Sequence, residues 1–178
     1  FRGELEHFLL HARQEGIDVL SARGSYAGAI GIPQFMPSSY RAFAVDYDGD
    51  GKRDLAGGVE DALGSVANYL KAHGWRRDQP TTVAARVEGD YYKQLLAAGI
   101  KPSVRAGDLE KLEIKTIQSL DPAALTCLLE LETPGAASEF WIGLDNFYVI
   151  TRYNQSSFYA IAVIELARER SEEHTSEL

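Results

Sequence analysis

The chain has 178 residues, of which 45% are hydrophobic and 25% charged, and its formal net charge is −8. This composition is typical of a globular protein, and the acidic balance argues against a protein that binds nucleic acid, which needs a basic face. No apolar run approaches the roughly 20 residues that span a bilayer. The single cysteine, Cys127, excludes an internal disulfide, and its apolar neighbours favour an inert buried thiol over a nucleophile.

The chain opens with a predicted helix at residues 3–14. Its apolar side chains repeat at the spacing of one helical face: Leu5, Phe8, Leu9 and Ala12. His7 and His11 lie four residues apart on this helix, which is a metal-ligand spacing, but the pattern lacks the intervening Glu and the third ligand of a zinc protease. We therefore interpret the two histidines as part of a partly exposed helix face.

Residues 21–33 are rich in Gly, Ala and Ser, which predicts a close-fitting loop rather than a core element. Pro33 is expected to open a short helical turn, and Ser38 or Ser39 to cap another. A strong helix is predicted at 59–73. The apolar stripe of that helix consists of Val59, Ala62, Leu63, Val66 and Leu70.

An acidic loop precedes that helix and has the spacing of a calcium-binding loop. Carboxylates stand at its first, third, fifth and ninth positions: Asp46, Asp48, Asp50 and Asp54. Gly51 occupies the sixth position, where a sharp turn brings the carbonyl of Lys52 towards the ion. Because alternating oxygen ligands of this kind converge on one hard cation, the pattern predicts a calcium site.

The twelfth position of this loop departs from the EF-hand pattern, because Gly57 carries no carboxylate. We choose Asp61 as the residue that closes a longer loop at 46–61, with Glu60 as the alternative. An Asp-rich solvated turn without a metal is the other interpretation, since Asp and Gly dominate turns. Because only one such loop is present, a structural ion is favoured over a calcium sensor.

The second half of the chain is predicted to mix strands and helices. Its main segments are strands at 81–87, 124–131 and 140–144 and a helix at 90–98. Ser156 or Ser157 is expected to cap a last helix that runs through Leu166. The tail at 170–178 has no apolar face and is expected to be disordered, and its spelling matches a translated sequencing adapter, so we leave it out of the fold prediction.

Two segments, 24–40 and 146–159, combine Gln, Asn and Ser with aromatic and small residues. Sugars present hydroxyl groups and apolar ring faces, so their sites pair amide and hydroxyl side chains with flat aromatic platforms. Small residues allow the backbone to approach a ligand closely. The pattern is compatible with carbohydrate binding, although aromatic residues at helical spacing are more often part of a core.

These segments and the acidic loop together resemble the MltB-type family of lytic murein transglycosylases. The resemblance is carried by five segments in the family's order: Gly24 to Tyr40, Asp46 to Asp54, Gly64 to Tyr69, His73 to Trp75, and Ile150 to Asn154. It implies an α+β, mainly helical fold, in which a lysozyme-like domain carries an inserted EF-hand-like calcium loop. Residues 1–75 and 136–169 would then form the catalytic domain, and 76–135 a small α/β insertion or subdomain.

For function, the resemblance implies cleavage of the MurNAc–GlcNAc bond of peptidoglycan by the MurNAc 6-hydroxyl group, which leaves a 1,6-anhydro end. The residues that match the family's substrate groove are Ser25, Gln34, Phe35, Tyr69, Tyr153, Asn154 and Tyr159. Gln34 and Asn154 would supply hydrogen bonds, and the aromatic residues would supply stacking. The calcium ion would be structural, with these ligands: Asp46, Asp48, Asp50, Asp61 and the carbonyl of Lys52.

The family's catalytic glutamate lies in a Glu-x-x-x-Gly motif N-terminal to the part of the family that this chain matches, and the chain has no equivalent motif. No catalytic residue is therefore carried over, and Glu4 and Glu6 match helix-surface positions instead. The resemblance implies a monomer in the periplasm that acts on peptidoglycan strands, attached to the outer membrane where a preceding segment anchors it. Two alternatives stay open: a non-catalytic, calcium-stabilised glycan-binding module, and a calcium-dependent regulatory protein.

Overall fold

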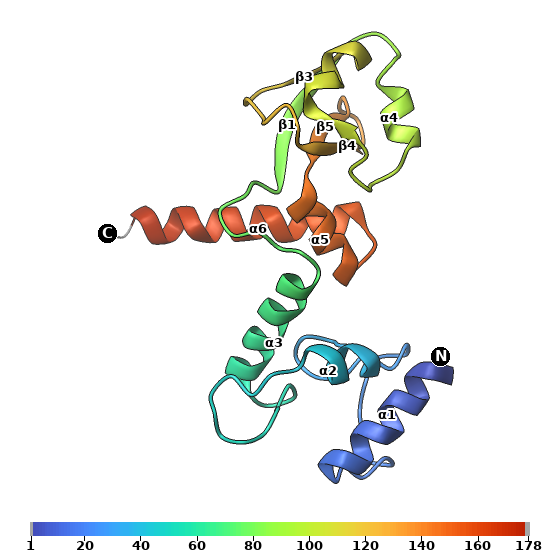
Figure 1. Ribbon diagram of the computed structural model, residues 1–178, viewed down its shortest axis with the longest axis vertical. Coiled ribbons are helices and arrows are strands. Elements are labelled where there is room, and N and C mark those ends of the chain that lie inside the picture. The colour runs from blue at the N-terminus through green and yellow to red at the C-terminus, as the bar shows by residue number, and fades with distance from the viewer. Residues whose placement is uncertain (1, 177–178) are drawn as a thin grey trace. The chain divides into compact units, whose positions relative to one another are not determined.

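The computed structural model describes residues 2–176, and the burial of side chains for residues 2–171. The chain forms two compact units, Phe1–His73 and Gly74–Leu178. The described part of the first unit consists of helices joined by long loops, and that of the second is a five-stranded sheet with helices (Figure 1). None of the described helices is both long enough and apolar enough to cross a membrane.

The helices of the first unit are α1 (Arg2–Glu15), α2 (Pro37–Phe43) and α3 (Val59–Ala72). The prediction that Ser38 or Ser39 caps α2 is wrong, because the helix begins at Pro37 and its cap residue makes no side-chain bond. The carboxylate of Glu4 on α1 replaces the cap, since it accepts the Ser38 amide at 2.9 Å and the Ser38 hydroxyl at 2.8 Å. A carboxylate suits this position because the first amides of a helix lack partners and form the positive end of its dipole.

Helix α3 buries only part of the stripe that its apolar spacing predicts. Val59 and Leu63 are 55% and 67% exposed. Ala62 of the predicted stripe is buried, together with four residues outside the stripe: Asp61, Gly64, Ser65 and Tyr69. Polar interactions determine which face is buried. The acidic loop and the residues before it pack on this side of the helix, and their backbone amides donate hydrogen bonds to Asp61 and Ser65.

Helix α1 also differs from the prediction, because its apolar residues Leu5 and Leu9 are 57% and 49% exposed, while His11 and Ala12 are buried. The ring of His11 lies 4.0 Å from that of Tyr40 on α2, and its Nδ1 has no hydrogen-bond partner among the described residues. Burial disfavours the charged imidazole and lowers the pKa of His11 from its ordinary value. The folded first unit therefore holds this histidine in its neutral form.

The second unit is built on an antiparallel sheet. Its strands are β1 (Thr82–Val87), β2 (Val104–Arg105), β3 (Ile114–Thr116), β4 (Leu125–Leu131) and β5 (Glu139–Gly143). They are ordered β2-β4-β5-β1-β3, and each neighbouring pair is antiparallel. The three predicted strands are confirmed as β1, β4 and β5, whereas β2 and β3 are too short to show an alternating pattern in the sequence.

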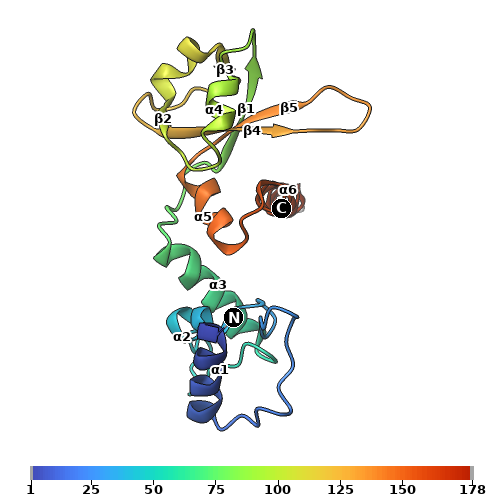
Figure 2. The same cartoon turned by 90° about the vertical axis from the view of Figure 1, so that its right-hand side faces the viewer.

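Helices cover both faces of this sheet (Figures 1 and 2). They are α4 (Lys93–Ala97), the 3-10 helix η1 (Ala106–Leu112), α5 (Asp145–Tyr153) and α6 (Ser157–Ser176). Cys127 and Leu129 pack with α5 and α6, whereas Leu128 and Ile142 pack with α4 and η1. Alternate residues of β4 thus enter two separate cores, which explains why the sequence of this strand is continuously apolar.

Two predictions about the C-terminal part need correction. The segment 136–169, expected to return to the first domain, forms one compact unit with the rest of 74–178. The reason is that β5 is an inner strand of the sheet and that α5 and α6 cover the same sheet. The tail at 170–178, expected to be disordered, is helical as far as Ser176, because charged residues with good helix propensity continue α6. Residues 177–178 lie outside the described residues.

We predict that the free energy of unfolding decreases as the pH falls below 6.5, the ordinary pKa of histidine. In that range the unfolded chain protonates His11, whereas the folded chain binds this proton only at lower pH, so protons favour unfolding. Urea unfolding between about pH 8 and about pH 5 measures the effect. The free energy of unfolding should change less with pH in His11→Leu than in the wild type. His7→Leu, on the same helix, serves as the control. If the free energy of unfolding of His11→Leu depends on pH as strongly as that of the wild type, the prediction is contradicted.

Candidate functional site

The carboxylates of the acidic loop converge in the structure. Oxygens of Asp46, Asp48 and Asp50 lie within 4.8 Å of one another, and the three side chains are exposed. Asp46 also folds the loop, because its carboxylate accepts the amides of Gly49 at 2.7 Å and Gly51 at 2.9 Å. Gly49 and Gly51 have φ angles of 79° and 88°, in the left-handed region that favours glycine. The sharp turn predicted at Gly51 is therefore confirmed.

Asp61, predicted to close the metal site, is buried in the first turn of α3 and binds the backbone of the loop. Its Oδ1 accepts the amides of Tyr47 at 2.7 Å and Asp48 at 3.4 Å, and its Oδ2 accepts the Asp54 amide at 2.8 Å. The side chain lies outside the group of mutually close carboxylates. Glu60, the alternative closing residue, is exposed. A single carboxylate therefore holds both ends of the acidic loop.

Electrostatics distinguish Asp61 from the exposed carboxylates. The hydrogen bond from the Tyr47 amide, helped by those from Asp54 and Asp48, keeps the pKa of Asp61 below its ordinary value against the effect of desolvation. For Asp48, the hydrogen bond from the Asp50 amide lowers the pKa, but desolvation and the neighbouring carboxylates outweigh it and the pKa is raised. Mutual repulsion among these acids is what a bound cation relieves.

The chemistry of the loop fits a hard cation. The converging groups are carboxylates, the Lys52 carbonyl follows them in the chain, and no Cys or His of the described part of the chain joins the group. The histidine pair on α1 does not form a second metal site. His7 Nδ1 lies 3.0 Å from Nη1 of Arg41, and His11 is buried.

A second set of candidate residues lies on the loop between α1 and α2. The hydroxyl of Ser25 accepts the Ala29 amide at 3.1 Å. Gln34 has a φ of 53°, and its side-chain amide donates to the Gly31 carbonyl at 2.9 Å. Ser25 and Gln34 are both exposed. Local hydrogen bonds thus orient two polar side chains that a ligand can reach.

Phe35 and Tyr69, predicted to stack on sugar rings, are only 2% and 8% exposed. Their rings lie in an aromatic cluster of the first unit, with centroids 5.6 Å apart. Tyr69 also stacks on His73 at 4.0 Å and meets the edge of Phe43 at 5.0 Å. This burial contradicts the stacking prediction, because a platform must offer an open ring face, and it makes the two residues a support for the loop that carries Gln34.

The remaining predicted residues, Tyr153, Asn154 and Tyr159, surround the junction of α5 and α6 in the second unit. Asn154 follows α5 with an extended backbone and is exposed. The hydroxyl of Ser156 accepts the Tyr159 amide at 3.2 Å. Ser156 is therefore the cap of α6, as predicted, and its hydroxyl holds the amide of Tyr159 in the first turn of the helix.

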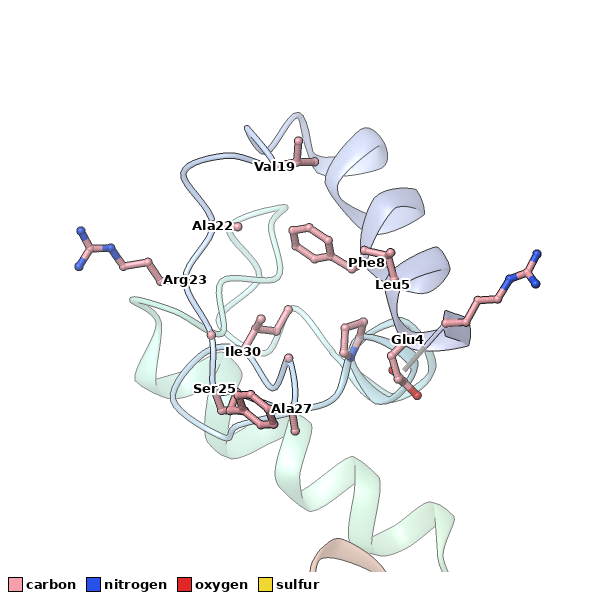
Figure 3. Close-up of a pocket in the computed structure, with 14 residues that line it drawn as sticks. Glu4, Leu5, Phe8, Val19, Ala22, Arg23, Ser25, Ala27 and Ile30 are labelled. Carbon is pink, nitrogen blue, oxygen red and sulfur yellow. The ribbon is translucent and has the colours of Figure 1, made fainter.

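A pocket of about 420 Å³ opens beside Ser25 (Figure 3). Leu5 and Phe8 line it from α1 and Ile30 lines it from the loop, so its walls are mainly apolar, while the side chain of Arg23 points away from it. The apolar spacing of α1 assigns Leu5 to a core, and for this reason the sequence does not predict the pocket.

Glu4 is the carboxyl group that lines this pocket. Burial raises its pKa, but the hydrogen bonds from the Ser38 amide and hydroxyl outweigh burial, so the pKa of Glu4 is lowered. A general acid needs a raised pKa in order to carry a proton at neutral pH. Glu4 is therefore held as an anion and serves α2 rather than proton transfer.

Comparison with known proteins gives a consistent result. The family described as Transglycosylase SLT domain matches residues 1–168. Membrane-bound lytic murein transglycosylase B of Escherichia coli (strain K12) is 45% identical over 168 residues, which make up 94% of this chain and 45% of that protein. The chain thus spans about half the length of the curated relative that it matches.

Solved structures of similar proteins share the α+β fold. The catenated lytic transglycosylase SltB1 from Pseudomonas aeruginosa has a TM-score of 0.90 at 43% identity, with 97% of this chain and 56% of that chain covered. The Escherichia coli lytic transglycosylase Slt35 in complex with calcium has a TM-score of 0.79 at 43% identity, with 93% and 51% covered. SltB3 from Pseudomonas aeruginosa in complex with NAG-anhNAM-pentapeptide has a TM-score of 0.74 at 35% identity, with 90% and 43% covered.

Replacing Asp61 should loosen the acidic loop even when no metal is bound. Asp61→Ala removes the acceptor of the Tyr47, Asp48 and Asp54 amides and leaves these donors unpaired. We expect a melting temperature lower by roughly 5–10 °C in the presence of a chelator, measured by circular dichroism. Glu60→Ala, the exposed neighbour, is the matched control. Equal melting temperatures for the two variants would argue against this role of Asp61.

Proposed function

The chain belongs to the Transglycosylase SLT domain family, and we propose that it is the part of a lytic murein transglycosylase that binds peptidoglycan strands. The span of the family match carries the proposal. The match covers residues 1–168 and so includes the Ser25 turn, the acidic loop and the α5–α6 junction. Exposed polar or aromatic side chains gather at each of these places, as a carbohydrate site and its supporting ion would require.

The proposed reaction is attack of the MurNAc 6-hydroxyl group on its own anomeric carbon, which breaks the bond to GlcNAc and leaves a 1,6-anhydro end. The anhydro sugar in the complex of the relative SltB3 supports this outcome. The leaving oxygen needs a proton from a general acid, and the conjugate base of that acid then takes the proton of the attacking 6-hydroxyl group. Since Ser38 holds Glu4 as an anion, we propose that the acid is a residue outside these 178.

The predicted groove residues of both units have separate proposed roles. Hydrogen bonds to the hydroxyl and acetamido groups of the sugars would come from Ser25, Gln34 and Asn154. Tyr153 and Tyr159 would offer ring faces to the apolar side of a sugar. The buried Phe35 and Tyr69 would contribute indirectly, because their packing holds the loop that carries Gln34.

We also propose that the loop at 46–61 binds a structural calcium ion in the manner of an EF-hand. Asp46, Asp48, Asp50 and the Lys52 carbonyl would hold the ion, because calcium takes six to eight oxygen ligands in a flexible geometry. Asp61 would complete the site from the base of the loop, which it already orients through three amides. The complex of the relative Slt35 with calcium supports this proposal.

We propose that the protein acts in the periplasm with outer-membrane association, because its proposed substrate belongs to the cell envelope and the curated relative is named as membrane-bound. A second candidate function is a non-catalytic, calcium-stabilised glycan-binding module. The observation that favours it is the anionic state of Glu4, the carboxyl group of the pocket beside Ser25. Both candidates predict that this chain alone releases no anhydro-ended muropeptides, whereas an active enzyme would release them.

We predict that the chain binds purified peptidoglycan but releases no anhydro-ended muropeptides, because sugar-binding side chains are present and a suitable general acid is absent from the pocket. Co-sedimentation measures binding, and mass spectrometry of the supernatant detects products. Asn154→Ala should weaken binding about three- to tenfold, as expected for the loss of one or two hydrogen bonds. Its exposed neighbour Gln155 provides the control variant, Gln155→Ala.

The two readouts have different meanings. Anhydro-ended products would show that a carboxylate among these residues acts as the acid, and the proposal of an external acid would be wrong. Binding without products supports a glycan-binding part that lacks its acid. If the chain neither sediments with peptidoglycan nor releases products, the proposed function is refuted.

Calcium should raise the melting temperature of the chain. An ion that binds only the folded state stabilises it by RT ln(1 + [L]/Kd), which is about 2.7 kcal/mol at a concentration of 100 Kd. Asp46→Ala should abolish this gain, since it removes one carboxylate of the group and two hydrogen bonds of the loop. Glu60→Ala should keep the gain if Asp61 closes the site. Scanning calorimetry with calcium and with chelator checks both, and identical wild-type curves would disprove calcium binding.

A further inference from the structure

The acidic loop contacts the turn that carries Gln34 at Leu55. This residue is only 1% exposed, and its carbonyl accepts the Ile32 amide at 2.7 Å. Gly31 lies against the same peptide group, since a Cβ at position 31 would be 2.4 Å from the Leu55 oxygen and 2.9 Å from its carbonyl carbon. The contact is therefore made between backbones and leaves no room for a side chain.

The turn at 30–35 depends on such outside support. Ile30 and Phe35 exchange two backbone hydrogen bonds of 2.9 and 3.1 Å, which close the turn. Between them the Gly31 carbonyl accepts both the main-chain amide of Gln34 at 3.1 Å and its side-chain amide at 2.9 Å. Gln34 has a φ of 53°, which few residues with a side chain adopt. Such a conformation persists only where the surrounding structure holds it.

The acidic loop fixes Leu55 from the other side. The amide of Asp54 donates to Asp61 at 2.8 Å, and the carbonyl of Asp54 accepts the Gly58 amide at 2.9 Å. The carboxylate of Asp54 accepts the Gly57 amide at 2.8 Å. Because the residues on both sides of Leu55 are bonded in this way, a movement of the loop must move Leu55 and its carbonyl.

We propose that Leu55 is a positioning residue, which transmits the order of the acidic loop to the 30–35 turn and thereby sets how well Gln34 binds a glycan. The part that concerns glycan rests on the proposed function, whereas the coupling between loop and turn does not. Binding linkage makes the effect reciprocal. A divalent cation that orders the loop tightens glycan binding, and a bound glycan tightens cation binding by the same factor.

Hydrogen exchange of a peptide covering 30–35 tests the coupling without any glycan. Asp46→Ala weakens the loop at Gly49 and Gly51, and it should speed the exchange of this peptide about two- to tenfold in chelator, the effect of loosening one hydrogen-bonded contact. Added calcium should slow the same peptide in the wild-type chain. If the response of Asp46→Ala is confined to peptides within 46–61, the coupling does not exist.

Two glycine variants test the contact itself. Gly31 and Gly16 have similar φ angles of 73° and 67°, so alanine is strained at both, but nothing lies within 4 Å of a Cβ at position 16. In co-sedimentation with peptidoglycan, Gly31→Ala should bind about tenfold more weakly and lose the calcium dependence of binding, while Gly16→Ala resembles the wild type. Equal binding by both variants would overturn the proposal. A wild-type chain that does not bind peptidoglycan would count against the proposed function, and hydrogen exchange would still decide the coupling.

Discussion

The first unit depends on one buried carboxylate that binds backbone amides instead of a cationic side chain. Asp61 lies in the first turn of α3, where the helix dipole favours a negative charge. A buried carboxylate is tolerated only when hydrogen bonds compensate for lost water, and the acidic loop supplies three of them. Loop and helix therefore stabilise each other. This support allows the loop to bring three exposed carboxylates close together without regular secondary structure of its own.

The same carboxylate explains why the sequence predicts the position of α3 but only part of its buried face. Apolar periodicity locates a helix well, and it assumes that the apolar stripe is buried. Here the acidic loop packs on the side of Asp61 and Ser65, so Val59 and Leu63 remain exposed. For β4 in the second unit the assumption holds, because both faces of the strand are covered by helices, and the prediction of this strand is confirmed. The unit boundary is not predictable in the same way, because it depends on pairings distant in sequence.

The candidate site is predictable where ligand geometry imposes a local spacing. Asp46, Asp48 and Asp50 are found by their alternation and converge as predicted. Aromatic residues give no such signal, because a phenylalanine such as Phe35 is equally expected in a sugar-binding groove and in a core. Only the burial of its side chain in the structure distinguishes the two. The contact of Gly31 with Leu55 could not be predicted, since it joins two loops whose approach is set by the whole first unit.

The sheet of the second unit ends on each side in a very short strand, β2 with two residues and β3 with three. Among the longer strands, β5 is paired on both sides, whereas β4 pairs with β2 only at Leu125 and Thr126, and β1 pairs with β3 only at residues 85–87. On their outer sides, residues 127–131 of β4 and 82–84 of β1 have no strand partner among the described residues, and an edge of this kind is where an extended segment of another chain can pair with a sheet.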